Sequence, residues 1–224
     1  MSAPRVVGVL VSGSGTNLQA LLDAAVRERL GGARIALVVS NRPGVRALER
    51  AATAGVAAEV IDHKAFADRA AFEQALVQRL RTAGVELVVL AGFMRLLGPT
   101  FLRAFPRCVV NIHPALLPAF PGVDGQGQAL AHGARIAGCT VHFVDEGTDS
   151  GPIVAQAAIP VLPDDSVDAL RARILAEEHR LLPQVVRWLA EGRVQVEGRR
   201  VIVAGARPAT GALRSPPLDD EETG

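Results

Sequence analysis

Tyrosine is absent from this sequence of 224 residues, and Lys64 is the only lysine among its 24 basic residues. We interpret this imbalance as a compositional bias that carries no functional signal. The 24 basic residues face 23 acidic residues, so the formal net charge is only +1. A chain with so little net charge has no overall positive field to attract a phosphate backbone, and we therefore expect no nucleic-acid partner.

Cysteine and long apolar runs are scarce as well. Cys108 and Cys139 stand far apart in apolar surroundings and lack the paired spacing of a zinc site or a redox dithiol, so we expect buried, reduced thiols. The first apolar run, Val6–Val11, is too short for a secretory signal. No run approaches the length that spans a bilayer. We expect a cytoplasmic protein with no membrane partner.

Several common catalytic patterns are also missing. No His-Glu-x-x-His pattern occurs, and the 5 histidines do not gather at metal-ligand spacing, so we expect no metal. No Gly-x-Ser-x-Gly sequence marks the nucleophile of a hydrolase. These absences argue against a metal-dependent or nucleophilic hydrolase.

Short apolar runs do alternate with longer segments of helical character. Strands are expected at Val6–Val11, Ile35–Ser40, Ala58–Ile61, Leu87–Ala91 and Cys108–Ile112, and helices at Leu18–Leu30, Val45–Ala54, Ala65–Ala83 and Pro99–Ala104. Near-continuous apolar strands separated by helices predict a parallel sheet covered on both faces. This arrangement is the doubly wound α/β architecture.

After residue 135 the expected strands come closer together. The expected elements are strands at Gly138–Val144 and Ile153–Val161, a long helix at Val167–Leu189, and a terminal hairpin of Val194–Val196 and Val201–Val203. The predicted fold class is α/β, with a doubly wound, mostly parallel sheet, a C-terminal long helix and a hairpin. We expect a single domain over residues 1–204. The Pro-, Gly- and acid-rich tail over 205–224 can bury little apolar surface, so we expect it to be disordered.

A glycine-rich turn follows the first expected strand. Ser12-Gly13-Ser14-Gly15-Thr16-Asn17 runs into a helix, where glycines and free amides can hold an anion such as phosphate. The third glycine of a dinucleotide fingerprint would fall on Leu18, and Ser40-Asn41-Arg42-Pro43 lacks its ribose-binding acid. The turn indicates a phosphate site, although a glycine turn with an Asn cap explains the motif equally well when it stands alone.

A polar pair ends the fifth expected strand. Asn111 and His113 project to the same side because side chains alternate along a strand, and Pro114 keeps His113 extended. An amide donor beside an imidazole suits stabilisation of an oxyanion and transfer of a proton. A carboxylate of the later acidic loop could meet His113. Taken alone, Asp149 is interpreted as a turn cap and His142 as a structural histidine.

Glu178 lies on the apolar face of the long helix, four residues from both Ile174 and Leu182. A carboxylate on such a face needs a partner. A cationic group of a ligand and a nearby arginine are equally good candidates.

Four motifs taken together resemble the phosphoribosylglycinamide formyltransferases, a family of folate-dependent enzymes. They are Ser12-Gly13-Ser14-Gly15-Thr16-Asn17-Leu18-Gln19-Ala20, Leu90-Ala91-Gly92-Phe93-Met94-Arg95, Asn111-Ile112-His113-Pro114-Ala115-Leu116-Leu117-Pro118, and His142-Phe143-Val144 through Asp149-Ser150-Gly151-Pro152-Ile153. The resemblance implies the Rossmann-like formyltransferase fold and a transferase of purine biosynthesis and one-carbon metabolism. The implied reaction moves a formyl group from 10-formyltetrahydrofolate to the amine of glycinamide ribonucleotide.

The resemblance also implies roles for individual residues. The catalytic residues would be Asn111, His113 and Asp149. The substrate's phosphate would bind the amides of Gly15, Thr16 and Asn17, and its glycinamide amine would face Glu178. The folate would be lined by Arg69, Met94, Arg95, Leu96, Leu97 and Asn111, with the backbone of residues 94–97 reading the pterin edge.

One loop departs from the family pattern, and some alternatives stay open. Many members carry a polar residue after the turn at Phe120-Pro121-Gly122, but here the chain continues as Val123–Gly127, a loop whose role is open. The length is expected to exclude methionyl-tRNA formyltransferases and formyltetrahydrofolate hydrolases. A dinucleotide-dependent oxidoreductase and a non-catalytic nucleotide-binding module are the alternatives, and both a monomer and a dimer are possible.

Overall fold

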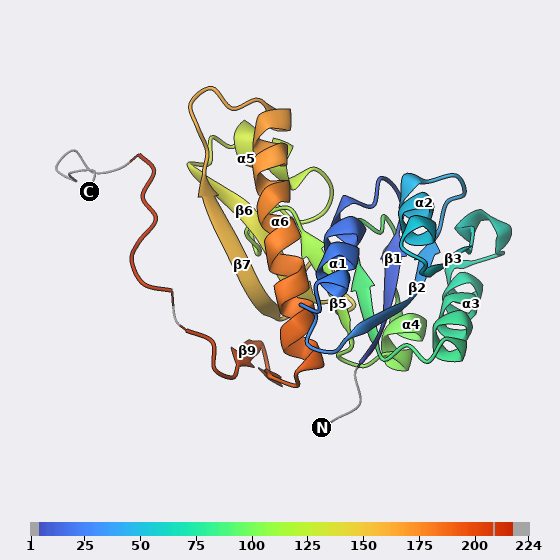
Figure 1. Ribbon diagram of the computed structural model, residues 1–224. Helices are drawn as coiled ribbons and strands as arrows, with labels where there is room; N and C mark the ends of the chain where they lie inside the picture. Colours follow the sequence, from blue (N-terminus) through green and yellow to red (C-terminus); the bar gives the residue numbers. More distant parts are fainter. Residues whose placement is uncertain (1–4, 208, 217–224) are drawn as a thin grey trace.

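The computed structural model describes residues 5–207 and 209–216 and centres on a seven-stranded sheet (Figure 1). The strands lie in the order β3-β2-β1-β4-β5-β6-β7. Their bounds are β1 Val6–Val11, β2 Arg34–Ser40, β3 Ala57–Val60, β4 Leu87–Leu90, β5 Val109–His113, β6 Ile136–Phe143 and β7 Ile153–Pro160. β1 to β5 pair in parallel, whereas β6 and β7 are antiparallel, which confirms a doubly wound, mostly parallel sheet.

Helices cover both faces of this sheet. They are α1 Thr16–Val26, α2 Arg46–Thr53, α3 Arg69–Thr82, α4 Pro99–Ala104, α5 Gly125–Ala131 and α6 Val167–Ala190, with a 3-10 turn, η1, at His63–Ala65. Buried side chains of α1, α2, α5 and α6 share one hydrophobic cluster with the sheet, and those of α3 and α4 share the other. The helix α1 lies beside α6, as Figure 1 shows.

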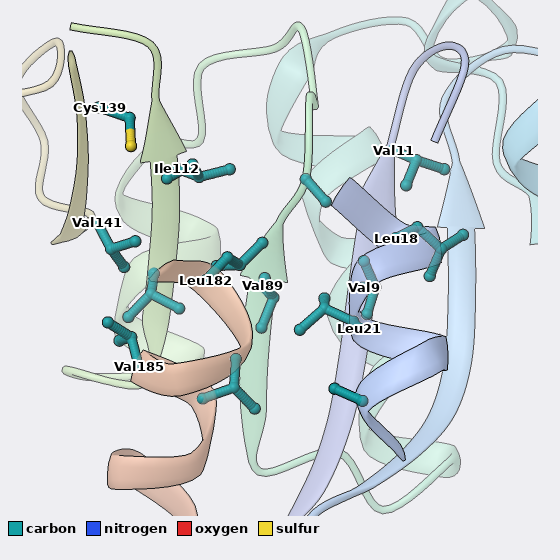
Figure 2. Packing of buried hydrophobic residues seen from close by; sticks show 14 of the residues in the cluster. Val9, Val11, Leu18, Leu21, Val89, Ile112, Cys139, Val141, Leu182 and Val185 are labelled. Carbon is teal, nitrogen blue, oxygen red and sulfur yellow. The ribbon is translucent and has the colours of Figure 1, made fainter. Parts of the chain in front are cut away.

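Alternate residues of the central strands point to opposite clusters. Val9 of β1 faces the cluster beneath α1 and α6, and its neighbour Leu10 faces the cluster beneath α3. Figure 2 shows Leu18 of α1 and Leu182 of α6 packed in the first cluster. Because both faces of the sheet are buried, its strands have the near-continuous apolar runs seen in the sequence. Full burial of one such leucine contributes about 1.5–3 kcal/mol.

Two predicted helices have different bounds in the structure. The helix predicted over Leu18–Leu30 begins at Thr16, directly after Gly15, and ends at Val26. The helix predicted over Ala65–Ala83 begins only at Arg69. The Asp68 carboxylate accepts a hydrogen bond from the Ala71 N–H at 2.8 Å, which caps the helix at that point.

The predicted loop over Val123–Gly127 is partly wrong, because α5 begins at Gly125. Asp124 accepts from the Gly127 N–H at 3.4 Å and caps this helix. The two glycines in its first turn disfavour a helix, which is why the sequence pattern did not reveal it. The segment therefore joins a short loop to a helix that packs against α6.

The C-terminal part contains the predicted hairpin, formed by β8 Val194–Glu197 and β9 Arg200–Val203. Residues 205–207 and 209–216 form no helix or strand. The remainder of the predicted disordered tail, residue 208 and residues 217–224, lies outside the described residues. None of the helices described here combines the length and the apolarity needed to traverse a bilayer.

The position of the site follows from the strand order. The chain proceeds outward from β1 through β2 to β3, and then crosses back to β4 on the other side of β1. The loops after β1 and β4 therefore lie at the carboxyl ends of the two strands where the strand order reverses, which is where ligands bind in open α/β sheets. The loop after β5 borders the same edge.

Candidate active site

Asn111, His113 and Asp149 lie together at the carboxyl end of β5. Asn111 Nδ2 donates to Asp149 Oδ1 at 3.5 Å, and His113 Nδ1 lies 3.3 Å from Asp149 Oδ2. Asn111 and His113 thus project to the same side of the strand, as predicted. Asp149 reaches them from the loop between β6 and β7, which begins beside them because β6 pairs with β5. We call these three residues the polar cluster.

The environment of Asp149 favours its charged form. Burial raises the pKa of Asp149, but contacts with His142, the Gly122 N–H and His113 outweigh burial and lower this pKa overall. The Gly122 N–H donates to Asp149 Oδ2 at 2.8 Å. The polar cluster therefore holds a carboxylate that is negative at neutral pH beside an imidazole.

The interpretation of Asp149 as a turn cap is wrong. Its neighbour Asp145 caps that turn, because Asp145 Oδ1 accepts from the Gly147 N–H at 3.1 Å and from Ser150 Oγ at 2.6 Å. Asp149 itself has a left-handed backbone with φ of 50°. This conformation is one that Asp and Asn tolerate better than most residues.

His142 is more than a structural histidine. Its Nδ1 lies 2.8 Å from the Phe143 carbonyl and donates to it, as a satisfied core histidine would. Its Nε2, however, lies 3.2 Å from Asn111 Nδ2 and 3.6 Å from Asp149 Oδ1. This contact follows from the register of the sheet, in which His142 on β6 pairs directly with Asn111 on β5.

The second nitrogen of His113 faces the loop that precedes α5. His113 Nε2 lies 2.9 Å from the Phe120 carbonyl oxygen and donates to it. Phe120 has a left-handed backbone, with φ of 54°. Both ring nitrogens of His113 thus face acceptor oxygens, so a doubly protonated ring can donate on both sides.

The glycine loop leaves the first amides of α1 without a side-chain cap. Gly15 stands before the helix with φ of 70°, and no side chain of the described residues caps this end. A Cβ at Gly15 would lie 2.6 Å from the Ala47 Cβ, so the loop is pressed against α2. Uncapped amides at a helix start are suitable donors for an anion.

Beside this loop, Asn17 of α1 contacts Glu178 of α6. Asn17 Nδ2 donates to Glu178 Oε2 at 2.6 Å, and both residues are buried. Burial raises the pKa of Glu178 more than the hydrogen bond from Asn17 lowers it. Asn17 Oδ1 is buried without a partner among the described residues. The partner of Glu178 is therefore an amide and not the arginine considered from the sequence.

The loop between β4 and α4 presents a mixed surface. Met94 is 58% exposed and Leu96 is 64% exposed, while Leu97 is buried in the cluster beneath α3 and offers only its backbone. Arg95 is exposed. Arg69 lies at the far end of this loop, where its Nε is 3.5 Å from Glu73 Oε1.

The sequence did not single out Glu73, which holds the end of this loop. Its buried carboxylate accepts from the Gly98 N–H at 2.6 Å and from the Phe101 N–H at 3.2 Å. A helical pattern alone gives Glu73 no special position. Its role depends on the packing of α3 against α4, which no local motif encodes.

Metal chemistry has no evident ligand set in residues 5–207 and 209–216. No group of three or more His, Cys, Asp or Glu side chains there could hold an ion.

Known proteins match both the sequence and the fold. The sequence pattern of the formyl transferase family matches residues 5–186. Phosphoribosylglycinamide formyltransferase of Bacillus subtilis is 43% identical over 181 residues, which are 81% of this chain and 92% of that protein. The crystal structure of glycinamide ribonucleotide transformylase 1 from Symbiobacterium toebii has a TM-score of 0.89 and 54% identity, covering 91% of this chain and 95% of that chain.

A longer protein also matches. The trifunctional purine biosynthetic protein adenosine-3 of Drosophila melanogaster is 50% identical over 188 residues, which are 83% of this chain but only 14% of that protein. This chain therefore spans a small part of the trifunctional relative and nearly the whole length of the bacterial relatives. With a family match across most of its length, the chain belongs to the formyl transferase family.

Proposed function

We propose that this protein transfers the formyl group of 10-formyltetrahydrofolate to the amine of glycinamide ribonucleotide, giving formylglycinamide ribonucleotide and tetrahydrofolate. The observation that carries the proposal is the polar cluster of Asn111, His113 and Asp149, which lies at the carboxyl end of β5, next to the pair β1 and β4 where the strand order reverses. The names of the bacterial relatives support the choice of substrates. The reaction belongs to purine biosynthesis.

The reaction creates and then removes a negative oxygen. The amine nitrogen attacks the formyl carbon, so a C–N bond forms while the carbonyl oxygen becomes an oxyanion. Collapse of this intermediate breaks the bond to the folate nitrogen, which takes up the proton that the amine has lost. Asn111 and His113 are the donors for the oxyanion, and the Asp149 carboxylate pairs with the His113 ring. When the substrates bind, the formyl oxygen takes the place of the Phe120 carbonyl oxygen as the acceptor of the hydrogen bond from His113 Nε2.

The glycinamide ribonucleotide is assigned to the glycine loop and its neighbour on α6. Its phosphate binds the amides of Gly15, Thr16 and Asn17, which no side chain of the described residues caps. Its glycinamide amine faces Glu178. A cationic amine would compensate the buried carboxylate, whose pKa burial raises.

The folate is assigned to the loop between β4 and α4. The exposed Met94 and Leu96 offer apolar contacts, and the backbone of residues 94–97 reads the polar edge of the pterin. Arg95 borders the same surface, and Asn111 reaches it from β5. Arg69 adds a guanidinium at the far end of the loop, where a folate carboxylate can pair with it.

The test is a direct assay of the purified protein with glycinamide ribonucleotide and a 10-formylfolate. We expect release of the deformylated folate only when both substrates are present. An NAD-dependent reduction would instead support the oxidoreductase alternative. The position of its ribose-binding acid is taken by Asn41, which is fully buried against Ser12. Binding of both ligands without turnover would support a non-catalytic binding module.

A cytoplasmic location is part of this proposal, because the two proposed substrates are small metabolites of purine biosynthesis. Cell fractionation tests the location. Sedimentation decides between a monomer and a dimer.

A further inference from the structure

One buried hydroxyl lies between the two loops assigned to the two substrates. Ser12 is the first residue after β1 and begins the glycine loop. Its Oγ accepts a hydrogen bond from the Met94 N–H at 2.8 Å, between the loops that follow the paired strands β1 and β4. The same Oγ donates to Asn41 Oδ1 at 2.5 Å. Ser12 therefore connects the glycine loop directly to residues 91–98, the loop between β4 and α4 that we call the folate loop.

Asn41 fixes the orientation of this hydroxyl. It follows β2 and is fully buried, and its backbone N–H donates to the Val11 carbonyl at 3.4 Å. Its side-chain amide and its carbonyl both lie near His63 Nδ1, at 3.3 Å and 3.1 Å. The Ser12 hydroxyl donates its hydrogen bond to Asn41 Oδ1. Its oxygen lone pairs therefore remain free to accept the hydrogen bond from the Met94 N–H.

The folate loop is held at its other end by a separate contact. Glu73 accepts from the Gly98 N–H at 2.6 Å, so residues 94–98 are suspended between two side-chain acceptors. Glu73 belongs to α3, on the face of the sheet opposite to α1. Of the two acceptors, Ser12 alone is itself part of the glycine loop.

We propose that Ser12, oriented by Asn41, is a positioning residue that couples the two substrate sites, so that each substrate binds more tightly when the other is present. A substrate bound to the amides of the glycine loop restrains that loop, and the hydrogen bond between Ser12 Oγ and the Met94 N–H passes the restraint to the folate loop, which then loses less freedom when it binds its own ligand. By linkage, the folate must strengthen binding of the ribonucleotide by the same factor.

The proposal rests on the proposed function, because it assumes that the two loops bind the two substrates. Its physical basis is the cost of an unmatched polar group. Ser12→Ala would remove both the acceptor of the Met94 N–H and the donor to Asn41 Oδ1. Buried polar groups without partners are costly, so the relative position of the loops would relax. A displacement of even 1 Å between reacting groups matters for catalysis.

The experiment measures the Kd of tetrahydrofolate with and without saturating glycinamide ribonucleotide, a pair that binds without reacting. The ratio of the two Kd values is the coupling factor. We expect a factor of at least about fivefold in the wild type, within the usual range of coupled sites. In Ser12→Ala the factor should fall close to one, so the Kd in the ternary complex should rise by about the factor that the wild type shows.

Glu73→Gln is the matched control at the other end of the folate loop. It should weaken tetrahydrofolate binding but leave the coupling factor as in the wild type, because the polar contacts of Glu73 are with Gly98, Phe101 and Arg69 and not with the glycine loop. Asn41→Ala should lower the coupling factor, and the double variant with Ser12→Ala should lower it no further, because both residues act in one path. Melting temperatures report the structural effect of each change.

Several outcomes separate failure of this proposal from failure of the proposed function. An active wild type with a coupling factor of one overturns the coupling. So does a Ser12→Ala variant that loses melting temperature but keeps the factor, since its role would then be structural only. If the wild type binds neither ligand, the proposed function itself is wrong.

Discussion

Asp149 and Glu178 are both shielded carboxyl groups of the candidate site, yet their surroundings shift their pKa values in opposite directions. Burial raises the pKa of each. Around Asp149, two histidines and the Gly122 N–H outweigh burial, so its pKa is lowered. Around Glu178, the single hydrogen bond from the Asn17 amide is too weak to offset burial, so the pKa of Glu178 stays raised. The number and charge of the donors therefore decide the direction in which the pKa of each carboxyl group moves.

The two groups suit different tasks for this reason. Asp149 carries its charge before any ligand arrives, so it can hold the His113 ring ready for an oxyanion. Glu178 gains from a cationic partner, because such a partner would compensate a charge that burial disfavours. We therefore expect changes at Asp149 to act mainly on kcat and changes around Glu178 to act mainly on KM.

Asp149→Asn tests the first half of this comparison and should have the largest effect. The substitution removes the charge, nearly preserves the shape, and suits the left-handed backbone with φ of 50°. We expect kcat to fall roughly a hundredfold or more, the scale of a lost acid–base or oxyanion contribution. Steady-state kinetics with both substrates measure this effect, and separate binding measurements should give Kd values near those of the wild type.

Unchanged turnover in Asp149→Asn would remove Asp149 from the mechanism. Collapse of ribonucleotide binding would instead assign the residue to holding the loop, through its bond from the Gly122 N–H.

Gly15→Ala tests the binding half through the glycine loop. Gly15 has φ of 70°, and an added Cβ would lie 2.6 Å from the Ala47 Cβ. The strain of a left-handed alanine adds to this overlap, so KM for the ribonucleotide should rise on the order of tens of fold. Gly13→Ala is the matched control, because a Cβ there meets nothing within 4 Å. An equal effect of both changes would contradict the assigned role of Gly15.

Glu178→Gln tests the expected effect on KM by removing the charge of the side chain alone. Glutamine keeps an acceptor for Asn17 Nδ2 but cannot pair electrostatically with an amine. We expect KM for glycinamide ribonucleotide to rise roughly tenfold, the value of a hydrogen bond to a charged group, while kcat changes less. Kinetics at saturating folate measure both constants. A loss confined to kcat would place Glu178 in the chemistry and erase the distinction drawn here.

The fold was predictable from the sequence in its central part. The strands β1, β2, β4 and β5 carry near-continuous apolar runs because both faces of the sheet are buried there. α5 escaped prediction because Gly125 and Gly127 weaken its helical pattern, and its stability comes from packing on α6. The start of α3 depended on which of two aspartates, Asp62 or Asp68, caps the helix.

The candidate site was predictable where a local pattern points into it. Alternation along β5 was sufficient to place Asn111 and His113 together. The partner of Glu178 was not predictable, because Asn17 lies 161 positions away and meets it only when α1 packs on α6. The pairing of Ser12 with Met94 has the same origin, since the two residues approach only where the sheet reverses.

The smallest expected effects are those of pH on stability, and they have opposite signs at the two carboxyl groups. The lowered pKa of Asp149 stabilises the folded state above the unfolded pKa of about 3.9, and this contribution is lost as the pH falls through the folded pKa. The raised pKa of Glu178 acts in reverse, because stability is lost as the pH rises above the unfolded value of about 4.3.

At pH 7 we therefore expect Asp149→Asn to melt lower and Glu178→Gln to melt higher than the wild type. Each change should be roughly 2–4 °C, which corresponds to about 1 kcal/mol in a domain of this size. Melting curves from pH 3 to pH 8 should show both differences shrinking toward the acid end, and shifts of the same sign at pH 7 would show that the two carboxyl groups do not differ in the way the structure indicates.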